Sequence, residues 1–245
     1  MNTSLTQELP ICAFVLAGGV GSRLKSVVSD RPKPMAMVDD RPFLEILVNF
    51  LSRQSISRIV LLTGFMSEHI EKFASGYPTS DITIQISREQ EPLGTGGAVK
   101  HAQEFATDPT LLVNGDTYFE ADIASLYQFH MKKDSEVTLS LCEVPDVSRY
   151  GSVLLDEDGL IRSFKEKSTE TSGPGIINAG FSMISYGLIS RLPSGRAFSM
   201  EREIFPTLMS SGRMHGLKQK GTFFDIGTPE SYLDFKKFVR NDSKI

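Results

Sequence analysis

The chain is short of the residues that most often carry metal or redox chemistry. Its 245 residues include two cysteines, four histidines and no tryptophan. Cys12 and Cys142 lie in apolar runs without metal-ligand spacing, so we expect them to be buried, reduced thiols. The histidines show neither metal nor catalytic-triad spacing, and we assign no chemistry to them: His69, His101, His130 and His215.

Long runs of one charge and long apolar runs are also missing. The formal net charge is −4 without a basic cluster, so we expect no nucleic-acid partner, because phosphate backbones need clustered positive charge. No apolar stretch reaches the length of a membrane span, so we expect no membrane partner. The first ten residues are polar and lack the regions of a signal peptide, which favours a cytoplasmic protein.

What is present is an alternation of apolar, strand-like runs with amphipathic segments. We predict strands at Ile11–Leu16, Arg58–Thr63, Ile82–Ile86, Thr110–Val113 and Val137–Leu141, and helices at Phe43–Arg53, Ser67–Ala74, Ala98–Phe105 and Ile123–Lys132. Such alternation predicts an α/β fold with parallel strands and helices on both faces of the sheet. Ligands of these folds bind at the carboxyl ends of the strands.

The pattern changes after Cys142. Two β-like runs flank Asp156-Glu157-Asp158-Gly159, a sequence typical of a hairpin turn. The predicted elements of this part are strands at Gly151–Leu155, Ile161–Lys165, Ile177–Ile184 and near Phe223, and helices near Met200–Met209 and at Glu230–Val239. Because no linker interrupts the chain, we predict one domain over residues 1–245, with halves at about 11–142 and 143–240.

A glycine-rich turn follows the first predicted strand, in Leu16-Ala17-Gly18-Gly19-Val20-Gly21-Ser22-Arg23-Leu24. Glycines without a Cβ let backbone N–H groups approach an anion, and Arg23 adds a permanent cation suited to phosphate. A dinucleotide-binding loop is disfavoured, because Leu24 stands at its third glycine position and two prolines interrupt the expected helix. The Walker pattern G-x-x-x-x-G-K-[ST] is absent, so a P-loop kinase or GTPase is also excluded.

Those prolines form a second feature, Arg31-Pro32-Lys33-Pro34. We expect a stiff, extended backbone here, which would hold the Lys33 ammonium near the same phosphates with little loss of entropy. A solvated surface lysine in a loop is the alternative interpretation.

The two features together resemble the paired signature of the sugar-1-phosphate nucleotidylyltransferases. The resemblance extends from about Ile11 to Phe238, and one departure is Ser22, where the family often has threonine. It implies a Rossmann-like, GT-A-like fold, a three-layer α/β/α sandwich with a mixed, mostly parallel sheet. It also implies that the first half binds the nucleotide and the second half binds the sugar phosphate.

A second glycine-rich segment, Glu91-Pro92-Leu93-Gly94-Thr95-Gly96-Gly97-Ala98, opens a predicted helix. Its glycines permit close backbone approach at a helix N-terminus, although a simple turn explains them too. By resemblance this loop binds the nucleobase, and its form is more similar to guanylyl-transferring members than to thymidylyl-transferring ones. The resemblance implies a nucleotide site made of Leu16, Ala17, Gly18, Gly19, Gly21, Ser22, Arg23, Lys33, Glu91, Pro92, Leu93, Gly94, Thr95, Asn114 and Gly115.

Two aspartates are candidate ligands of Mg²⁺, the expected cofactor. Asp116 ends an apolar strand and Asp225 follows another apolar run. Magnesium prefers few carboxylates together with phosphate oxygens and water. A helix N-cap, the alternative for Asp225, is better assigned to Thr228, because Pro229 suits the first helical position. In the family the corresponding aspartates hold the metal between the nucleotide and the sugar phosphate.

The second half supplies the implied sugar site. Alternation places Phe164 and Glu166 on one face of a strand and Lys165 and Lys167 on the other. The alternative interpretation of these charges is a solvated edge of a hairpin. By resemblance, Glu166 binds sugar hydroxyls and Lys167 binds the sugar phosphate. The remaining implied contacts come from Tyr150, Gly151, Asn178, Ala179 and Gly180.

The implied reaction is attack of a sugar 1-phosphate oxygen on the α-phosphorus of a nucleoside triphosphate. This nucleophile is already an anion, so catalysis needs positioning and charge neutralisation rather than a general base. By resemblance, Arg23 holds the departing phosphates, Lys33 acts near the α-phosphate and Lys167 on the sugar phosphate. The catalytic residues implied are therefore Arg23, Lys33 and Lys167.

Within the family the chain most resembles the guanylyltransferases of D-glycero-α-D-manno-heptose 1-phosphate, which make GDP-heptose for bacterial surface glycans. The segments Asn178–Phe181 and Ser199–Pro206 carry this resemblance, together with a length that leaves no room for a long C-terminal extension. Mannose 1-phosphate guanylyl transfer is the first alternative, followed by thymidylyl or uridylyl transfer to glucose or N-acetylmuramate 1-phosphate. A non-catalytic nucleotide-sugar sensor is an alternative of another class. The sequence leaves the oligomeric state open, a homo-oligomer included.

Overall fold

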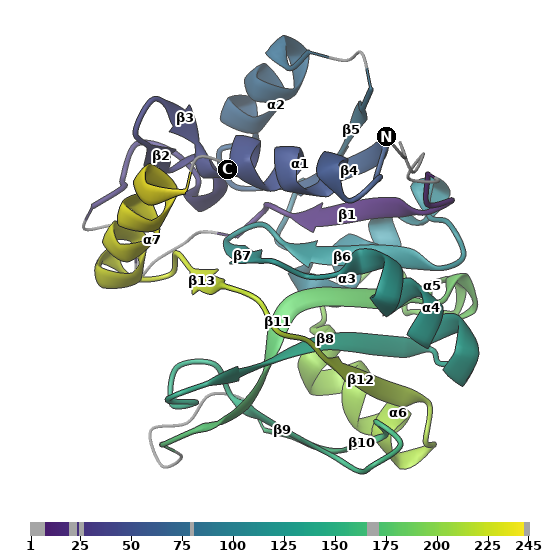
Figure 1. The fold of residues 1–245 in the computed structure, drawn as a ribbon. Helices are drawn as coiled ribbons and strands as arrows, with labels where there is room; N and C mark the ends of the chain where they lie inside the picture. The colour runs from purple at the N-terminus through teal and green to yellow at the C-terminus, as the bar shows by residue number, and fades with distance from the viewer. Residues whose placement is uncertain (1–7, 20–23, 25–26, 79–80, 166–171, 243–245) are drawn as a thin grey trace, which may run out of the picture.

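The computed structural model describes residues 8–19, 24, 27–78, 81–165 and 172–242. At its centre lies a seven-stranded sheet in the order β12-β8-β11-β6-β1-β4-β5 (Figure 1). The strands are β1 (Cys12–Leu16), β4 (Arg58–Thr63), β5 (Thr83–Arg88), β6 (Thr110–Asn114), β8 (Val137–Val144), β11 (Gly175–Ile184) and β12 (Met214–Lys218). β11 runs antiparallel to β6 and β8, and the other neighbours are parallel. The predicted mixed, mostly parallel sheet is therefore confirmed.

Alternating side chains along each strand divide the core into two layers. In β1, Ala13 and Val15 point to one face of the sheet, while Cys12 and Phe14 point to the other. The first face is covered by α1 (Phe43–Arg53), α2 (Ser67–Gly76), α4 (Ile123–Lys133) and α7 (Pro229–Asn241). The second is covered by α3 (Gly94–His101), α5 (Tyr186–Arg191) and α6 (Phe205–Ser210). The arrangement is the predicted three-layer sandwich.

Outside the main sheet lie three pairs of short strands. β9 (Ser152–Leu155) and β10 (Ile161–Lys165) form the predicted hairpin, at the end of the molecule opposite α2 (Figure 1). In its turn, Asp156 Oδ1 accepts the N–H groups of Asp158 and Leu160 at 3.1 and 2.9 Å. The other pairs are β2 (Met37–Val38) with β3 (Arg41–Pro42), and β7 (Thr117–Phe119) with β13 (Phe223–Asp225).

Several sequence-based boundaries are wrong. The helix expected over 98–105 begins earlier, as α3, and is followed by a 3₁₀ helix at Gln103–Phe105. The helix expected near Met200–Met209 is found there, as a π-helix at Met200–Ile204 followed by α6. We did not predict β2, β3, β7, β12 or α5. These elements are short, so their apolar periodicity covers too few residues to be distinguished from a loop.

The backbone around Lys33 also differs from the prediction. Pro32 is extended, but Lys33–Met35 is a 3₁₀ turn rather than a stiff extended segment. Pro34 fits the first turn of a helix because the N–H groups there have no partner within the helix. The direction of the Lys33 side chain is therefore set by this helical turn as well as by the two prolines.

The two cysteines are buried and unpaired, as expected. Burial raises the pKa of the Cys12 thiol to about 11 and that of Cys142 to about 12. Both groups are therefore protonated near neutral pH and serve as small apolar side chains. Among the helices of the described residues, none is long and apolar enough to cross a membrane.

Candidate functional site

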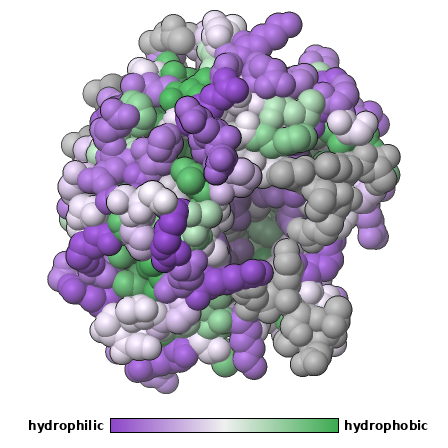
Figure 2. Space-filling view, turned by 180° about the vertical axis from the view of Figure 1, so that it is seen from behind, coloured by the Kyte–Doolittle hydropathy of each residue, from purple (hydrophilic) through white to green (hydrophobic). Residues whose placement is uncertain are grey.

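A cleft opens where several strands of the sheet end. Its first cavity, of about 500 Å³, is lined by Leu16 at the end of β1, Leu62 near the end of β4 and Asn114 at the end of β6. Figure 2 shows a recess on the face turned away from the viewer of Figure 1, with many hydrophilic side chains around it. The cavity therefore has the position expected of a ligand site in an α/β sheet.

Gly115 joins the ends of β6 and β1. Its N–H donates to the carbonyl oxygen of Leu16 at 3.0 Å, and a Cβ at this position would lie 2.3 Å from the same oxygen. No larger residue can therefore be accommodated without moving the backbone. The close approach fixes the next residue, Asp116, at the floor of the cleft.

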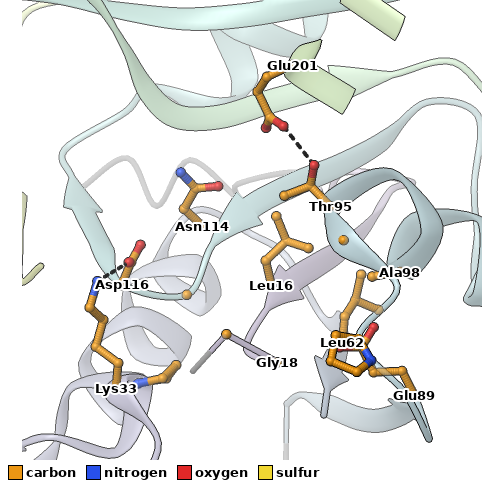
Figure 3. Close-up of a pocket in the computed structure, with 15 residues that line it drawn as sticks. Leu16, Gly18, Lys33, Leu62, Glu89, Thr95, Ala98, Asn114, Asp116 and Glu201 are labelled. Atoms are coloured by element: carbon orange, nitrogen blue, oxygen red, sulfur yellow. Dashed lines mark hydrogen bonds and ion pairs between the residues drawn. The ribbon is translucent and has the colours of Figure 1, made fainter. Parts of the chain in front are cut away.

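Asp116 meets Lys33 there. The Lys33 Nζ donates to Asp116 Oδ2 at 2.5 Å, and the lysine side chain is only 9% exposed (Figure 3). The alternative of a solvated surface lysine is therefore wrong. The ion pair holds the ammonium in place, and its other N–H groups can donate to an anionic ligand in the cleft.

Asp225 reaches the same place from the other half of the chain. β13 pairs with β7 so that Asp225 lies opposite Thr117, and Ile226 N–H donates to the carbonyl oxygen of Asp116 at 3.0 Å. Thr228 caps α7 and Pro229 is its first residue, as predicted. Asp225 is thus not the cap, and its Oδ1 accepts Gly227 N–H at 2.5 Å.

These two carboxylates suit a magnesium ion. No group of three or more His, Cys, Asp or Glu side chains in the described part of the chain could hold a metal by itself. Two carboxylates are too few ligands for a closed structural zinc site. Mg²⁺ binds through one or two carboxylates and completes its shell with water and phosphate oxygens, so Asp116 and Asp225 fit it.

A second cavity, of about 320 Å³, adjoins the first. The two share Asn114, Asp116 and Glu201 in their linings. Three of the residues predicted from the second half line it, namely Tyr150, Asn178 and Asp225. The cleft can therefore hold two ligands whose neighbouring ends meet at Asp116.

An irregularity of β11 shapes this second cavity. The pairing of β11 with β8 shifts between Asn178 and Ser182, and Gly180 within the shift has φ +81°. Gly180 N–H donates to Asn178 Oδ1 at 3.0 Å, and a Cβ on Gly180 would lie 3.1 Å from Asn114 Nδ2. The bulge bends the strand beside β6 and keeps Asn178 at the cavity.

The first glycine-rich turn is described only in part. Gly18 and Gly19 line the first cavity, Ala17 is buried, and Gly21, Ser22 and Arg23 lie outside the described residues. A Cβ on Gly19 would meet no atom within 4 Å. The Gly19 backbone therefore borders open space, as contact with a ligand requires.

The second glycine-rich segment lies along the same cavity. Pro92, Gly94 and Thr95 line it, whereas Glu91 is exposed and lies outside the lining. Gly94 and Gly96 also have a structural role, because a Cβ on either would collide with Phe198 at 2.5 or 2.1 Å. Part of the glycine content is thus explained by packing.

The remaining predicted residues divide into three groups. Leu93 lies in this loop, where its N–H binds Glu89 Oε2 at 3.1 Å. Gly151, with φ +82°, and Ala179 are buried. Glu166 and Lys167 lie outside the described residues.

Among the lining residues that were not predicted from the sequence are Glu89, Glu201 and Arg149. Glu89 follows β5 directly, so the rule that selected Asp116, an acid at the end of a parallel strand, would have found it. Glu201 lies on the π-helix, and its Oε2 accepts hydroxyls from Thr95 and Ser199 at 2.7 and 2.6 Å. Glu201 lies in Ser199–Pro206, a segment that carries the resemblance, but no role was predicted for it, and no sequence signal marked Arg149.

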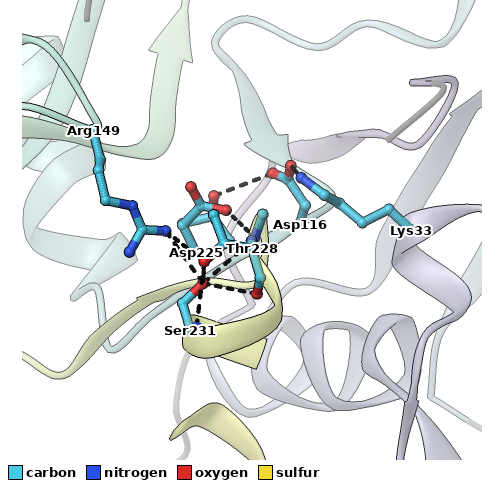
Figure 4. A network of polar contacts seen from close by, with 8 residues as sticks. Lys33, Asp116, Arg149, Asp225, Thr228 and Ser231 are labelled. Atoms are coloured by element: carbon cyan, nitrogen blue, oxygen red, sulfur yellow. Dashed lines mark hydrogen bonds and ion pairs between the residues drawn. The ribbon is translucent and has the colours of Figure 1, made fainter. Parts of the chain in front are cut away.

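Arg149 connects the second cavity to the helix that follows Asp225. Its guanidinium donates to Thr228 Oγ1 at 3.1 Å and to Ser231 Oγ at 3.3 Å (Figure 4). The same guanidinium lies over the ring of Tyr150. The cation thus braces the N-terminus of α7 next to a predicted metal ligand, and it adds positive charge to the cavity.

Comparison with known proteins gives one family over almost the whole chain. The family described as nucleotidyl transferase matches residues 12–242. A D-glycero-alpha-D-manno-heptose 1-phosphate guanylyltransferase of Aneurinibacillus thermoaerophilus is 35% identical over 94% of this chain and 98% of that protein. A mannose-1-phosphate guanylyltransferase of Mycobacterium tuberculosis is 34% identical over 90% of this chain and 62% of that protein.

A solved structure is also similar over its full length. HddC from Yersinia pseudotuberculosis has a TM-score of 0.84 and 35% identity, covering 94% of this chain and 99% of that one. It has also been solved in a complex with GMP-PN, with the same TM-score.

Proposed function

The chain belongs to the nucleotidyl transferase family, and on this premise we propose that it makes GDP-heptose from GTP and D-glycero-α-D-manno-heptose 1-phosphate. Nucleotidyl transfer to a sugar 1-phosphate is the activity. The observation that carries the proposal is the pair of cavities that meet at Asp116. The guanine and heptose assignments are supported by the names of two relatives, each 35% identical over more than 90% of this chain.

The first cavity is assigned to the nucleotide. Its apolar part, lined by Leu16, Leu62 and Ala98, suits a planar base. Its other part contains Lys33, Asn114 and Asp116, where phosphates would lie. Gly18 and Gly19 border this cavity with backbone rather than side chains. Arg23, Gly21 and Ser22 keep the phosphate-binding role predicted for them from the sequence.

The second cavity is assigned to the sugar phosphate. Tyr150 and Asn178 can bind hydroxyl groups, and Arg149 and Arg202 contribute positive charge. Gly180 shapes this site by allowing the bulge. Lys167 and Glu166 retain their predicted roles on the sugar phosphate and the sugar hydroxyls.

The reaction is an in-line substitution at the α-phosphorus. A bond forms between an oxygen of the sugar phosphate and the α-phosphorus, and the bond from the α-phosphorus to the bridging β-phosphate oxygen breaks, so that pyrophosphate leaves. The nucleophile is already deprotonated at neutral pH. In keeping with this, no histidine of the described chain lines either cavity.

Positioning and charge neutralisation are what the protein supplies. Lys33 places a buried cation beside Asp116, where the two phosphates meet. Asp116 and Asp225 would hold Mg²⁺, which neutralises phosphate charge when bound. Arg149 holds Thr228 and Ser231, and thereby keeps the chain after Asp225 in place.

A panel assay tests the proposal. The purified protein is incubated with each of GTP, UTP, dTTP and ATP, combined with heptose, mannose and glucose 1-phosphates, and pyrophosphate release is measured with Mg²⁺ present. We expect the highest kcat/KM for GTP with D-glycero-α-D-manno-heptose 1-phosphate. Faster turnover of dTTP or UTP would overturn the guanine assignment. Binding of nucleotide sugars without turnover of any pair would favour a sensor.

Mannose 1-phosphate guanylyl transfer is the second candidate, because the mycobacterial relative with that name is 34% identical. The same panel separates the two candidates. A kcat/KM for mannose 1-phosphate above that for the heptose would replace the first proposal with the second.

A further inference from the structure

A third cavity, of about 540 Å³, lies outside the cleft. Residues of α1 and α2, which run beside each other in Figure 1, form most of its lining. It shares no residue with the linings of the first and second cavities. Its volume is close to the 500 Å³ of the cavity assigned to the nucleotide, and volumes in this range are typical of small-molecule sites. The third cavity is therefore a separate space that can hold a ligand of similar size.

Part of this lining is aromatic and apolar. Phe73 near the end of α2 and Tyr77 just after it have ring centroids 5.5 Å apart, with planes inclined at 57°. The Tyr77 hydroxyl donates to Asn49 Oδ1 at 2.5 Å, so its ring is held against α1. Met35 adds a thioether and Pro42 an apolar ring. Such a surface suits a flat heterocycle, because aromatic rings and sulfur pack well against one.

Polar and charged side chains complete the lining. His69 and Lys72 are three positions apart on α2, so they share a face of that helix. Glu45 lies opposite them, on α1. Within the described part of the chain, the side chains of Glu45, His69 and Lys72 form no ion pair and no hydrogen bond. His69 and Lys72 can therefore donate to phosphate oxygens, and Glu45 can accept from amino or hydroxyl groups.

A single 3₁₀ turn connects this cavity to the first one. Lys33 and Pro34 of the turn line the first cavity, and its last residue, Met35, lines the third. The next residue, Ala36, is buried, and its N–H donates to the Lys33 carbonyl at 3.0 Å. The Ala36 carbonyl accepts the N–H of Phe43, the first residue of α1, at 2.9 Å. Because three consecutive residues span the two cavities, a ligand that displaces Met35 also displaces Lys33.

We propose that the third cavity is an inhibitory site for a nucleoside diphosphate, which acts on Lys33 through this turn. The aromatic rings match the base, the donors on α2 match the diphosphate, and Glu45 matches donors of the base or the ribose. The Lys33 Nζ lies 2.5 Å from Asp116 Oδ2, so a shift of the turn separates this pair and lowers kcat. Inhibition rests on the proposed nucleotidyl transfer, whereas binding at the third cavity does not.

Steady-state kinetics with GDP test this proposal. When GTP and the sugar 1-phosphate are both saturating, GDP is displaced from the first cavity, so a lower kcat reports binding elsewhere. We expect GDP to lower the wild-type kcat by at least about fivefold. Lys72→Glu places a negative charge beside the diphosphate and should lose this inhibition while keeping the basal kcat. The matched control, Lys132→Glu, changes an exposed lysine of α4 outside all three cavities and should be inhibited like the wild type.

Equilibrium dialysis with GDP measures binding without turnover. We expect two GDP molecules per chain in the wild type and in Lys132→Glu, and one in Lys72→Glu. A second kinetic arm replaces GDP with the GDP-sugar product, and the compound that inhibits at the lower concentration is the ligand that the site serves. One GDP per chain in the wild type, or an unchanged wild-type kcat, would overturn the inhibitory site. A protein that turns over no substrate pair yet binds two GDP molecules, one of them lost in Lys72→Glu, would instead overturn the proposed function.

Discussion

The Nζ atom of Lys33 lies 2.5 Å from Oδ2 of Asp116, although 83 positions separate the two residues in the chain. The contact joins a 3₁₀ turn after β1 to the end of β6, at the point that the two cavities share. A cation and a carboxylate are therefore fixed where two phosphate groups would meet. Neither ligand has to order this pair on binding, which is the benefit of a preorganised site.

Replacing Asp116 tests this pair. In Asp116→Asn the amide oxygen can still accept from Lys33, so we expect the protein to fold. The loss of one carboxylate next to the phosphates should lower kcat by about 100-fold or more. Pyrophosphate release and circular dichroism measure the two effects. Asp158→Asn, whose side chain is 90% exposed, is the control, and full activity in a folded Asp116→Asn protein would contradict the metal assignment.

Removal of divalent metal should abolish activity and leave the fold intact. Asp116 and Asp225 supply two carboxylates, too few for a structural site, so stability should not depend on the ion. We expect EDTA to stop pyrophosphate release and added Mg²⁺ to restore it. The melting temperature of the ligand-free protein should change by less than about 2 °C. Undiminished turnover in EDTA would show that the reaction needs no metal.

Gly180 and Gly212 form a matched pair for testing the bulge in β11. Both have positive φ, +81° and +69°, so alanine at either should cost about 1 kcal/mol of stability. A Cβ on Gly180 also contacts Asn114 and Thr117, whereas one on Gly212 meets nothing within 4 Å. We expect Gly180→Ala to lower kcat/KM more than tenfold and Gly212→Ala to leave it unchanged. Equal kcat/KM values for the two variants would show that the bulge does not contribute to the site.

The stability of the protein should fall in mild acid because of His130. Burial lowers the pKa of His130 to about 4, and its Nδ1 hydrogen-bonds Thr138 Oγ1 at 2.9 Å. The unfolded state, with a pKa near 6.5, takes up the proton first, so stability is full above that pH and decreases from about pH 6.5 towards 4. The loss from this group amounts to roughly 3 kcal/mol, and burial of His215 adds to the same trend.

Denaturant unfolding between pH 7.5 and pH 4 measures this effect. His130→Gln should flatten the dependence, whereas exposed His101→Gln should retain it. An unaltered pH profile in a folded His130→Gln protein would place the acid sensitivity elsewhere, because the remaining shifted groups then account for it. The carboxyl pKa values of Asp30, Asp39, Asp146 and Asp156 are all lowered, so they add a separate loss in more acidic solution.

Long, periodic elements could be predicted from the sequence because their pattern reports directly on burial. The helix Phe43–Arg53 has the predicted bounds, since its apolar residues recur at helical spacing against the sheet. The segment around Lys33 could not be predicted, because two prolines are compatible with an extended chain and with the first turn of a 3₁₀ helix. Local sequence restricts φ there but does not select ψ.

Within the site, Asp116 was predicted from the sequence, whereas Glu89 was not. Both are acids at the ends of parallel strands, yet only Asp116 follows a strand with a buried apolar run, Leu111–Val113. β5 lies at the edge of the sheet and most of its residues are exposed or half-buried, so the strand was predicted to end at Ile86 and the acid after it was not recognised. Glu89 is also packed against Gly18 and Gly64, which come from two other parts of the chain.

The sequence by itself determined the class of fold and the family, because hydrophobic period and glycine spacing are local properties. The tertiary structure decided which side chains meet. Insertion of antiparallel β11 between β6 and β8, and the pairing of β13 with β7, bring Asn178 and Asp225 to Asp116. Strand order depends on packing across the whole sheet, and no segment of the sequence carries that information alone.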